Sequence, residues 1–417
     1  HKLYTLGETV YGGLFMKYRS KKFTAIIMLA AGLSVTACSP DSSKDSARRE
    51  KAAAEAENYQ PQGILAKSLP EIADALNKGE ITSQALVQLY LDRINAVDRN
   101  GPTLQAVLRV NPDALADAKA LDALRAAGTI RGPLHGVPIL LKDNIETKGP
   151  MATTAGALAL KDNITGRDSP LVAGLREAGA IILGKTNLSQ WANFRSENSM
   201  SGWSAMGGQV RNPHMLDRNP CGSSSGSGAA TSASLAAGSV GTETDGSVIC
   251  PSNANGIVGF KPTVGLVPQQ YIIPISASQD TAGPMTKTVM GAAMMMNAMA
   301  TAAPDTDFTA GLNLDALKGV RVGVLQYAKG GFGPIVEHFE AGLKILEDAG
   351  AILVNIDERP IMPENYDTMS YDLLKYEFKD GLNAYLASTP ETVKARTLAE
   401  LITFNQDNAD VEFALFD

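Results

Sequence analysis

The sequence predicts an α/β fold in which a mixed, mostly parallel central sheet is covered by helices on both faces. Helical and strand patterns alternate along the 417 residues, as they do in βαβ units. Gly and Ala are abundant, whereas aromatic residues make up only 6% of the chain, which favours helices packed closely on a sheet over a β sandwich. A chain of this length can also bury a sizeable core.

The first elements are marked by capping signals and apolar runs. Ser68 followed by Glu71 is the pattern of a capping box, and Thr82 can cap the next helix. Residues 137–141 form a continuous apolar run of the kind buried in a parallel sheet. We therefore expect helices over residues 69–79, 82–99 and 112–127, and strands over residues 104–110 and 137–141.

The alternation continues to the end of the sequence. Ser169 can cap a helix that begins with Pro170, and Gly179 ends it. The methionines of the Ala/Met-rich run at 289–302 are typical of core filling. We expect helices over residues 170–178, 229–237, 289–302 and 334–349, strands over residues 180–184, 320–325 and 352–356, and a helix still in progress over residues 400–417.

Residues 16–38 have the features of a bacterial secretion signal. Met16 is followed by basic residues and then by an apolar run too short to span a bilayer. Residues 35–38 (Val-Thr-Ala-Cys) resemble a lipoprotein box, which implies that Cys38 is lipidated and anchors the protein on the periplasmic side of the cell envelope. Residue 39 is not Asp, which by the same resemblance favours the outer membrane. An ordinary signal peptide with a chance cysteine is the alternative.

The sequence divides into a leader and one domain. Residues 1–15 do not fit a signal and are interpreted as upstream translated or non-native residues. We assign residues 16–37 to the signal peptide, residues 38–62 to a polar tether and residues 63–417 to the domain. The net charge of −7, with both signs mixed throughout, argues against a nucleic-acid partner, and membrane contact is expected through the lipid anchor only.

The histidines and cysteines do not form a metal motif. The histidines after the leader are His135, His214 and His338, and they fit no HExxH spacing. The three cysteines form no CxxC and are too few for a disulfide scaffold. We therefore expect neither a metal nor an organic cofactor.

The stretch from residue 218 to 266 interleaves Gly and Ser with apolar residues, a pattern that flexible linkers lack. Such small side chains predict backbone packed closely on backbone or substrate, as on the floor of an active site. Residues 222–226 match G-x-S-x-G, the nucleophile elbow of hydrolases. Polar residues precede the match, and only His338 lies downstream as a base, so the elbow is the weaker hypothesis.

Lys142 is a stronger candidate base. It ends the apolar run at 137–141, and burial there would lower its pKa from about 10.4 toward neutrality, leaving an amine that accepts a proton. The alternative is a structural lysine paired with Asp143.

Three ordered segments resemble the amidase signature family. They cover residues 136–144 (GVPILLKDN), 221–227 (CGSSSGS) and 241–251 (GTETDGSVICP), and Gly-Phe-Lys-Pro-Thr follows at 259–263. Ser223 and Ser247 keep the family's spacing of 24 positions between its two serines. The resemblance extends from about residue 65 to residue 417 and implies the amidase-signature fold.

The resemblance implies a role for each site residue. Ser247 would be the nucleophile, Ser223 (preceded by a cis peptide bond in the family) the relay, and neutral Lys142 the base of a Ser–cisSer–Lys mechanism. The implied reaction hydrolyses an amide to an acid and ammonia without a cofactor. The implied oxyanion donors are the backbone N–H groups of Thr244, Asp245, Gly246 and Ser247.

Departures from the family pattern point to one branch. Glu243 and Asp245 replace the usual aspartate and glycine, and Cys221 and Cys250 flank the two serines. These strings resemble the peptide amidase branch, which implies a small amide or a peptide with a C-terminal amide as substrate. The two cysteines are either buried free thiols or a disulfide.

Two rival functions remain open. One is the amidating subunit of tRNA-dependent amidotransferase, which would work in the cytosol, contrary to the secretion signal. The other is a non-catalytic envelope lipoprotein, because family chains normally continue past residue 417 and the C-terminal part of the fold is expected to be missing. The oligomeric state is not indicated by the sequence.

Overall fold

The computed structural model describes residues 59–415. The predicted signal peptide, Cys38 and most of the tether lie outside the described residues. Within the part described, no helix is both long and apolar enough to cross a membrane. The described part corresponds to the predicted domain and the last residues of the tether.

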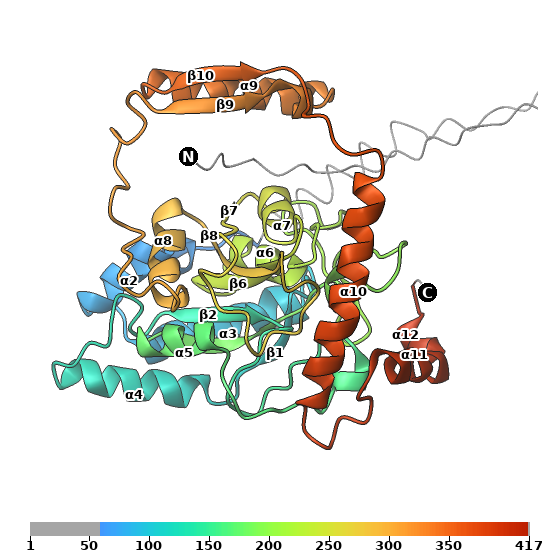
Figure 1. The fold of residues 1–417 in the computed structure, drawn as a ribbon. Helices are drawn as coiled ribbons and strands as arrows, with labels where there is room; N and C mark the ends of the chain where they lie inside the picture. Colours follow the sequence, from blue (N-terminus) through green and yellow to red (C-terminus); the bar gives the residue numbers. More distant parts are fainter. Residues whose placement is uncertain (1–58, 416–417) are drawn as a thin grey trace, which may run out of the picture.

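A six-stranded mixed sheet forms the centre of the molecule (Figure 1). Its strands are β1 (Val107–Val110), β2 (Pro138–Lys142), β3 (Ile181–Thr186), β6 (Gly238–Glu243), β7 (Val258–Gly259) and β8 (Thr281–Thr286). In the order β1-β3-β2-β6-β8-β7, the central strands β3, β2 and β6 run parallel, and the flanking pairs are antiparallel. β2 and β3 are buried along their whole length, which explains their continuous apolar runs.

Helices cover both faces of the sheet, as predicted. They are α2 (Leu69–Asn77), α3 (Ser83–Arg93), α4 (Ala114–Ala126), α5 (Pro170–Glu177), α6 (Ser225–Ser232), α7 (Ile249–Ala254) and α8 (Val289–Met299). Because side chains alternate between the faces of a strand, Gly238 and Gly241 of β6 point to opposite sides. A Cβ on Gly238 would contact Met295 of α8, whereas one on Gly241 would contact Ser224 at the start of α6. The α/β fold with a mixed sheet is therefore confirmed.

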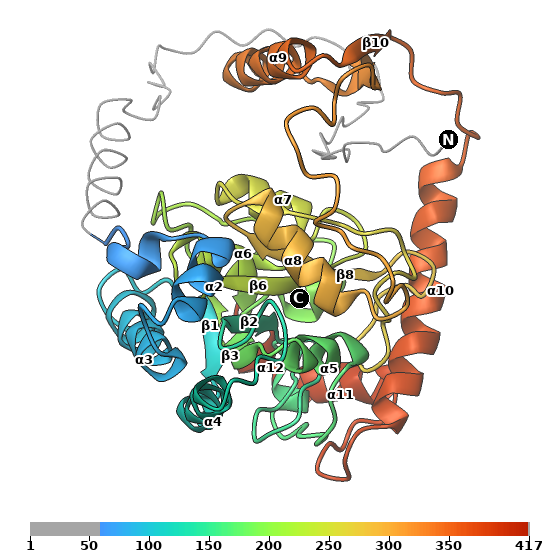
Figure 2. The same ribbon diagram turned by 90° about the vertical axis from the view of Figure 1, so that its left-hand side faces the viewer.

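The last part of the chain forms two further structures. β9 (Arg321–Leu325), α9 (Gly333–Asp348) and β10 (Ile352–Ile356) make a parallel βαβ unit that stands apart from the central sheet in Figures 1 and 2. The chain then returns along the main body as α10 (Tyr366–Ala387), α11 (Leu398–Asp407) and α12 (Ala409–Glu412). Leu382 and Leu386 of α10 join a second apolar cluster with Leu160 and Ile273.

Short elements complete the fold. They are the strands β4 (Trp203–Ser204) and β5 (Gly208–Gln209) and the short helical turns η1 (Gly63–Ala66), η2 (Ile94–Arg99), η3 (Leu158–Leu160), η4 (Gln190–Asn193) and η5 (Gln326–Ala328). β4 and β5 form an antiparallel pair of their own.

Most predicted elements are confirmed, and three differ from the structure. The Ser68 capping box forms, and the Thr82 hydroxyl accepts the N–H of Ala85 at 3.1 Å. The helix expected over 82–99 becomes a π-helix at η2. The helix expected over 229–237 is confirmed only over 229–232, because α6 ends before Ser234, whose φ of 57° is left-handed. The continuous helix expected over 400–417 is wrong, because Asn408 has non-helical angles and separates α11 from α12.

Candidate active site

The three predicted catalytic residues meet at one edge of the central sheet. Lys142 ends β2, Ser223 precedes α6 and Ser247 lies in the turn between β6 and α7. Since β2 and β6 are adjacent and parallel, their carboxyl ends lie side by side. Ser223 and Ser247 line one pocket of about 250 Å³, including its open mouth, and Ser247 is 7% exposed. The Gly222–Ser223 peptide bond is cis, as the resemblance implies.

Lys142 is placed to act as a base on Ser223. Its Nζ lies 2.7 Å from Ser223 Oγ, 2.9 Å from Thr242 Oγ1 and 3.2 Å from the Thr242 carbonyl oxygen. Complete burial lowers the pKa of Lys142 from 10.5 to about 7, although the negative charges of Asp280 and Glu243 oppose this effect. A large fraction of Lys142 is therefore neutral near pH 7 and can accept a proton from Ser223.

Asp143 pairs with Lys185, so the hypothesis of a structural Lys142–Asp143 pair is wrong. Lys185 Nζ lies 3.4 Å from Asp143 Oδ1, and both side chains are fully buried. Lys185 also donates to the Ile145 carbonyl at 2.6 Å. Consecutive residues at the end of a strand point to opposite faces, which separates Asp143 from Lys142. The sequence held a signal for this pair, because Lys185 also follows an apolar run, at 180–183.

Hydrogen bonds and a disulfide join the turns that carry the two serines. The N–H of Ser224 donates to the Ser247 carbonyl at 3.1 Å. Ser224 Oγ accepts the N–H of Thr242 and donates to its carbonyl, both at 3.1 Å. Cys221 and Cys250 form a disulfide. The interpretation of these two cysteines as buried free thiols is therefore wrong. Ser223 and Ser247 are thus held by their immediate neighbours.

Glu243 stabilises the turn that carries Ser247. Its buried carboxylate accepts the N–H groups of Gly246 at 3.0 Å, Val248 at 2.7 Å and Ile249 at 2.9 Å. The N–H of Gly246 is thus engaged within the turn in this structure. For Thr244, Asp245, Gly246 and Ser247 the oxyanion role stays a prediction.

Two side chains whose roles the sequence analysis missed hold Thr244. Thr244 Oγ1 donates to Asp280 Oδ1 at 2.5 Å, and Lys261 Nζ donates to the Thr244 carbonyl at 2.7 Å. Asp280 Oδ2 accepts the N–H groups of Ile275 at 2.8 Å and Ser276 at 3.0 Å. Lys261 belongs to the recognised segment 259–263, which was a usable signal. Asp280 lies in a polar stretch whose composition does not distinguish it from an exposed loop.

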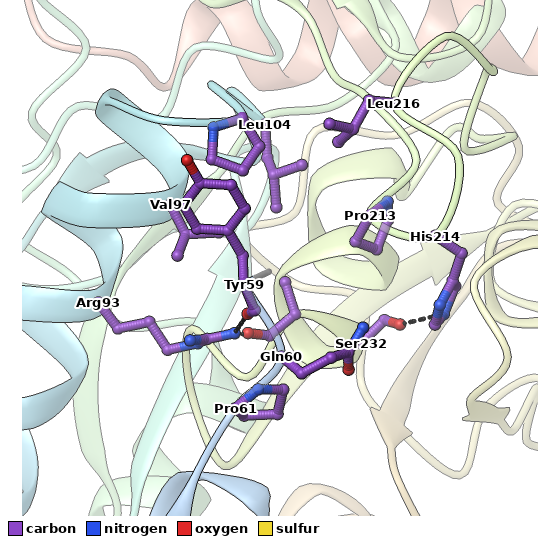
Figure 3. Close-up of a pocket in the computed structure, with 12 residues that line it drawn as sticks. Tyr59, Gln60, Pro61, Arg93, Val97, Leu104, Pro213, His214, Leu216 and Ser232 are labelled. Atoms are coloured by element: carbon purple, nitrogen blue, oxygen red, sulfur yellow. Dashed lines mark hydrogen bonds between the residues drawn. The ribbon is translucent and has the colours of Figure 1, made fainter. Parts of the chain in front are cut away.

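A separate pocket at the other end of α6 contains a serine–histidine pair (Figure 3). Ser232 Oγ lies 2.8 Å from His214 Nε2, and both atoms contact the Asn255 carbonyl oxygen, at 2.7 and 3.0 Å. None of the residues that line this pocket is acidic, so no carboxylate there orients the imidazole. His338, which the elbow hypothesis requires as a base, lies in α9 of the unit that stands apart. These positions disfavour a serine–histidine mechanism.

Comparison with known sequences finds amidases. A family model described as Amidase matches residues 85–411. A probable amidase from Arabidopsis thaliana is 40% identical over 369 residues, which cover 84% of this chain and 70% of the plant protein. A glutamyl-tRNA(Gln) amidotransferase subunit from Acidothermus cellulolyticus is 40% identical over 301 residues, which cover 69% and 58% of the two proteins. The chain spans between 49% and 70% of the length of three curated relatives it matches.

Comparison with solved structures finds the same architecture. The native peptide amidase from Stenotrophomonas maltophilia is 46% identical and superposes with a TM-score of 0.78, covering 84% of this chain and 73% of that chain. An amidase family protein from Bacillus anthracis is 32% identical with a TM-score of 0.77, covering 88% and 77%. The similarity in fold thus accompanies substantial similarity in sequence.

Proposed function

The chain belongs to the amidase signature family, and from that premise we propose that it hydrolyses carboxamides to a carboxylic acid and ammonia through a serine acyl-enzyme. The observation that carries this proposal is the 2.7 Å separation of Lys142 Nζ and Ser223 Oγ beside the pocket that Ser247 also lines. A buried lysine with a pKa of about 7 supplies the base that a weak serine nucleophile requires.

The reaction proceeds in two halves. Ser247 Oγ attacks the amide carbon while its proton passes to Ser223 and the Ser223 proton passes to Lys142. The C–N bond of the tetrahedral intermediate then breaks, and the departing nitrogen receives a proton from Lys142 through Ser223 and leaves as ammonia. A water molecule then attacks the resulting ester while its proton passes through Ser223 to Lys142. The proton returns to Ser247 Oγ as the carboxylic acid leaves, which restores the Ser247 hydroxyl.

The substrate class we propose is the C-terminal amide of peptides. Similarity to the peptide amidase of Stenotrophomonas maltophilia, at 46% identity over 84% of this chain, supports this class. The small pocket beside Ser247 also suits a primary amide, whose leaving group is only ammonia.

A second candidate is ammonia-producing amidotransferase activity. Several glutamyl-tRNA(Gln) amidotransferase subunits, at 36% to 40% identity, favour it. Such a protein would release ammonia from glutamine rather than from amidated peptides. The choice of amide in the assay therefore separates the two candidates.

The test is ammonia release from an amidated dipeptide, from glutamine and from acetamide. Ser247→Ala and Lys142→Ala should each lower the rate by at least about a thousandfold. Ser232→Ala is the matched control, because it removes a serine that bonds His214 at the other end of α6, and it should keep the parent rate. Loss in Ser232→Ala with retention in Ser247→Ala would reject the mechanism. A folded parent chain that releases no ammonia and resists a serine-reactive probe would support the non-catalytic alternative.

We also propose that Cys38 carries a lipid anchor on the periplasmic side of the bacterial envelope, on the basis of the lipoprotein-like residues 35–38. Metabolic labelling with a fatty acid should mark the parent chain in a bacterial host. Cys38→Ala should remove the label and release the protein from the membrane fraction. Labelling that survives the substitution would refute the anchor.

A further inference from the structure

A second cavity adjoins the catalytic pocket. It encloses about 550 Å³, including its open mouth, and it shares Gln269, Ile272 and Asp280 with the pocket of Ser247. α10 forms its far wall through Gly381 and Tyr385. A substrate whose carbonyl lies at Ser247 can therefore extend directly into this cavity.

The wall of the cavity offers apolar surface. Ile272, Pro274, Ala277 and Gly381 contribute carbon atoms to it. Polar side chains of the wall bond within the protein: Asp280 accepts from three groups, the Tyr385 hydroxyl accepts from Asn163 at 2.8 Å, and Gln269 Nε2 donates to the Val267 carbonyl at 2.7 Å. A polar substrate group would have to displace these bonds, whereas an apolar group gains from leaving water.

The cavity is held in shape by contacts between α10 and the loop opposite. Glu377 of α10 accepts hydrogen bonds from the Ser276 hydroxyl and, at 3.0 Å, from the Ser278 hydroxyl. One turn further along α10, a Cβ on Gly381 would lie 3.1 Å from Pro274 Cγ. A glycine in the middle of a helix is usually less favourable than alanine, because it has more conformational freedom to lose on folding. Here it lets the helix approach the loop closely.

We propose that this cavity is the subsite for an apolar side chain next to the scissile carbonyl. The proposal rests on the amidase function proposed above and specifies its substrate: amides whose acyl side carries a branched or aromatic group, such as peptides that end in an amidated leucine. Ala277 lines this cavity and is exposed, so a larger side chain can replace it without disturbing the core.

The experiment compares acetyl-leucine amide with acetyl-alanine amide. The parent chain should favour the leucine amide in kcat/KM by about tenfold or more, the usual gain from filling an apolar pocket. Ala277→Leu should lower this preference by about tenfold, because the added side chain occupies part of the cavity. Ala384→Leu is the matched control, since it makes the same change at an exposed position of α10 that does not line the cavity, and it should keep the parent preference.

A binding measurement separates this proposal from the reaction itself. Calorimetric titration of Ser247→Ala with the two amides should show tighter binding of the leucine amide, and adding Ala277→Leu should abolish the difference. Equal binding of the two amides, or equal loss in the Ala384→Leu control, would overturn the subsite. If binding shows the preference but the parent chain releases no ammonia, the subsite stands and the proposed hydrolysis fails.

Discussion

Replacing Asp280 by Asn should extend amide hydrolysis to lower pH. Lys142 must be neutral to accept a proton, so activity is lost as pH falls through the pKa of Lys142, about 7. The Asp280 carboxylate favours the charged form of Lys142 and so raises this pKa. Without that carboxylate, Lys142 stays neutral at lower pH.

The size of the effect follows from the two protonation states. Below about pH 7, kcat/KM of the parent chain should fall about tenfold for each unit of pH, because the neutral fraction of Lys142 falls in that proportion. Asp280→Asn should move this fall to lower pH by roughly one unit, which is the lower end of the pKa shifts that a nearby opposite charge produces. At about pH 6, kcat/KM relative to its own high-pH plateau should then be several-fold higher in Asp280→Asn than in the parent chain.

The assay is ammonia release from acetyl-leucine amide at low substrate concentration, between about pH 5 and 9, since this substrate does not titrate there. Each profile is normalised to its own plateau, because Asp280 also holds Thr244 and its loss is expected to lower the plateau. Asp315→Asn is the control. It removes an exposed carboxylate paired with Lys318 and should not move the profile.

Two results would refute this reasoning. A profile that stays flat down to about pH 5 would mean that no group like Lys142 must lose a proton. A fall that moves to higher pH in Asp280→Asn would mean that the carboxylate supports the neutral form of Lys142. Burial also raises the pKa of Asp280 itself, so a second inflection in the parent that disappears in the variant belongs to Asp280.

Three further predictions concern stability. Cys221→Ala combined with Cys250→Ala should lower the free energy of unfolding by about 3–4 kcal/mol for a link across 29 positions, measured by urea unfolding, and added reductant should destabilise the parent but not the variant. Lys185→Met should cost about 3–5 kcal/mol by leaving the buried Asp143 carboxylate unpaired, and adding Asp143→Leu should recover much of that loss; a double variant no better than the single one would contradict the pairing. Lys142→Met should be inactive, and because the folded pKa of Lys142 lies below its unfolded value, the parent should gain stability relative to this variant as pH rises from about 7 toward 10, by up to about 1.4 kcal/mol per pH unit. Unfolding curves at several pH values check this last prediction, and a difference that is independent of pH would contradict it.

The sequence predicted those features that local patterns encode. The apolar run before Lys142 identified a buried strand, and the ordered segments around Ser223 and Ser247 identified the site. The capping signals at Ser68 and Thr82 correctly located two helix starts. The strand and the helix starts are encoded by neighbouring residues, whereas the site was predicted from the resemblance of the ordered segments to a known family.

The features that sequence reasoning missed depend on contacts between distant segments. β6 has the sequence Gly-Ser-Val-Gly-Thr-Glu and so lacks the apolar run of a central strand. Its side chains are small because α6 and α8 pack closely against its two faces. No local pattern could show that the Thr242 hydroxyl would meet Lys142. The polar segment around Asp280 carries no local sign that the fold places it against Thr244.

Because β2 and β6 are adjacent, the geometry of the candidate site does not depend on the length of chain between the two strands. Lys142 and Thr242 are 100 positions apart, yet they contact each other because two neighbouring strands end at the same edge. The intervening loops can lengthen, shorten or change composition without moving the lysine relative to the serine turns, provided that the strands keep their register. Exchange of loops can therefore alter the substrates that such a fold accepts, while the residues proposed to transfer protons keep their relative positions.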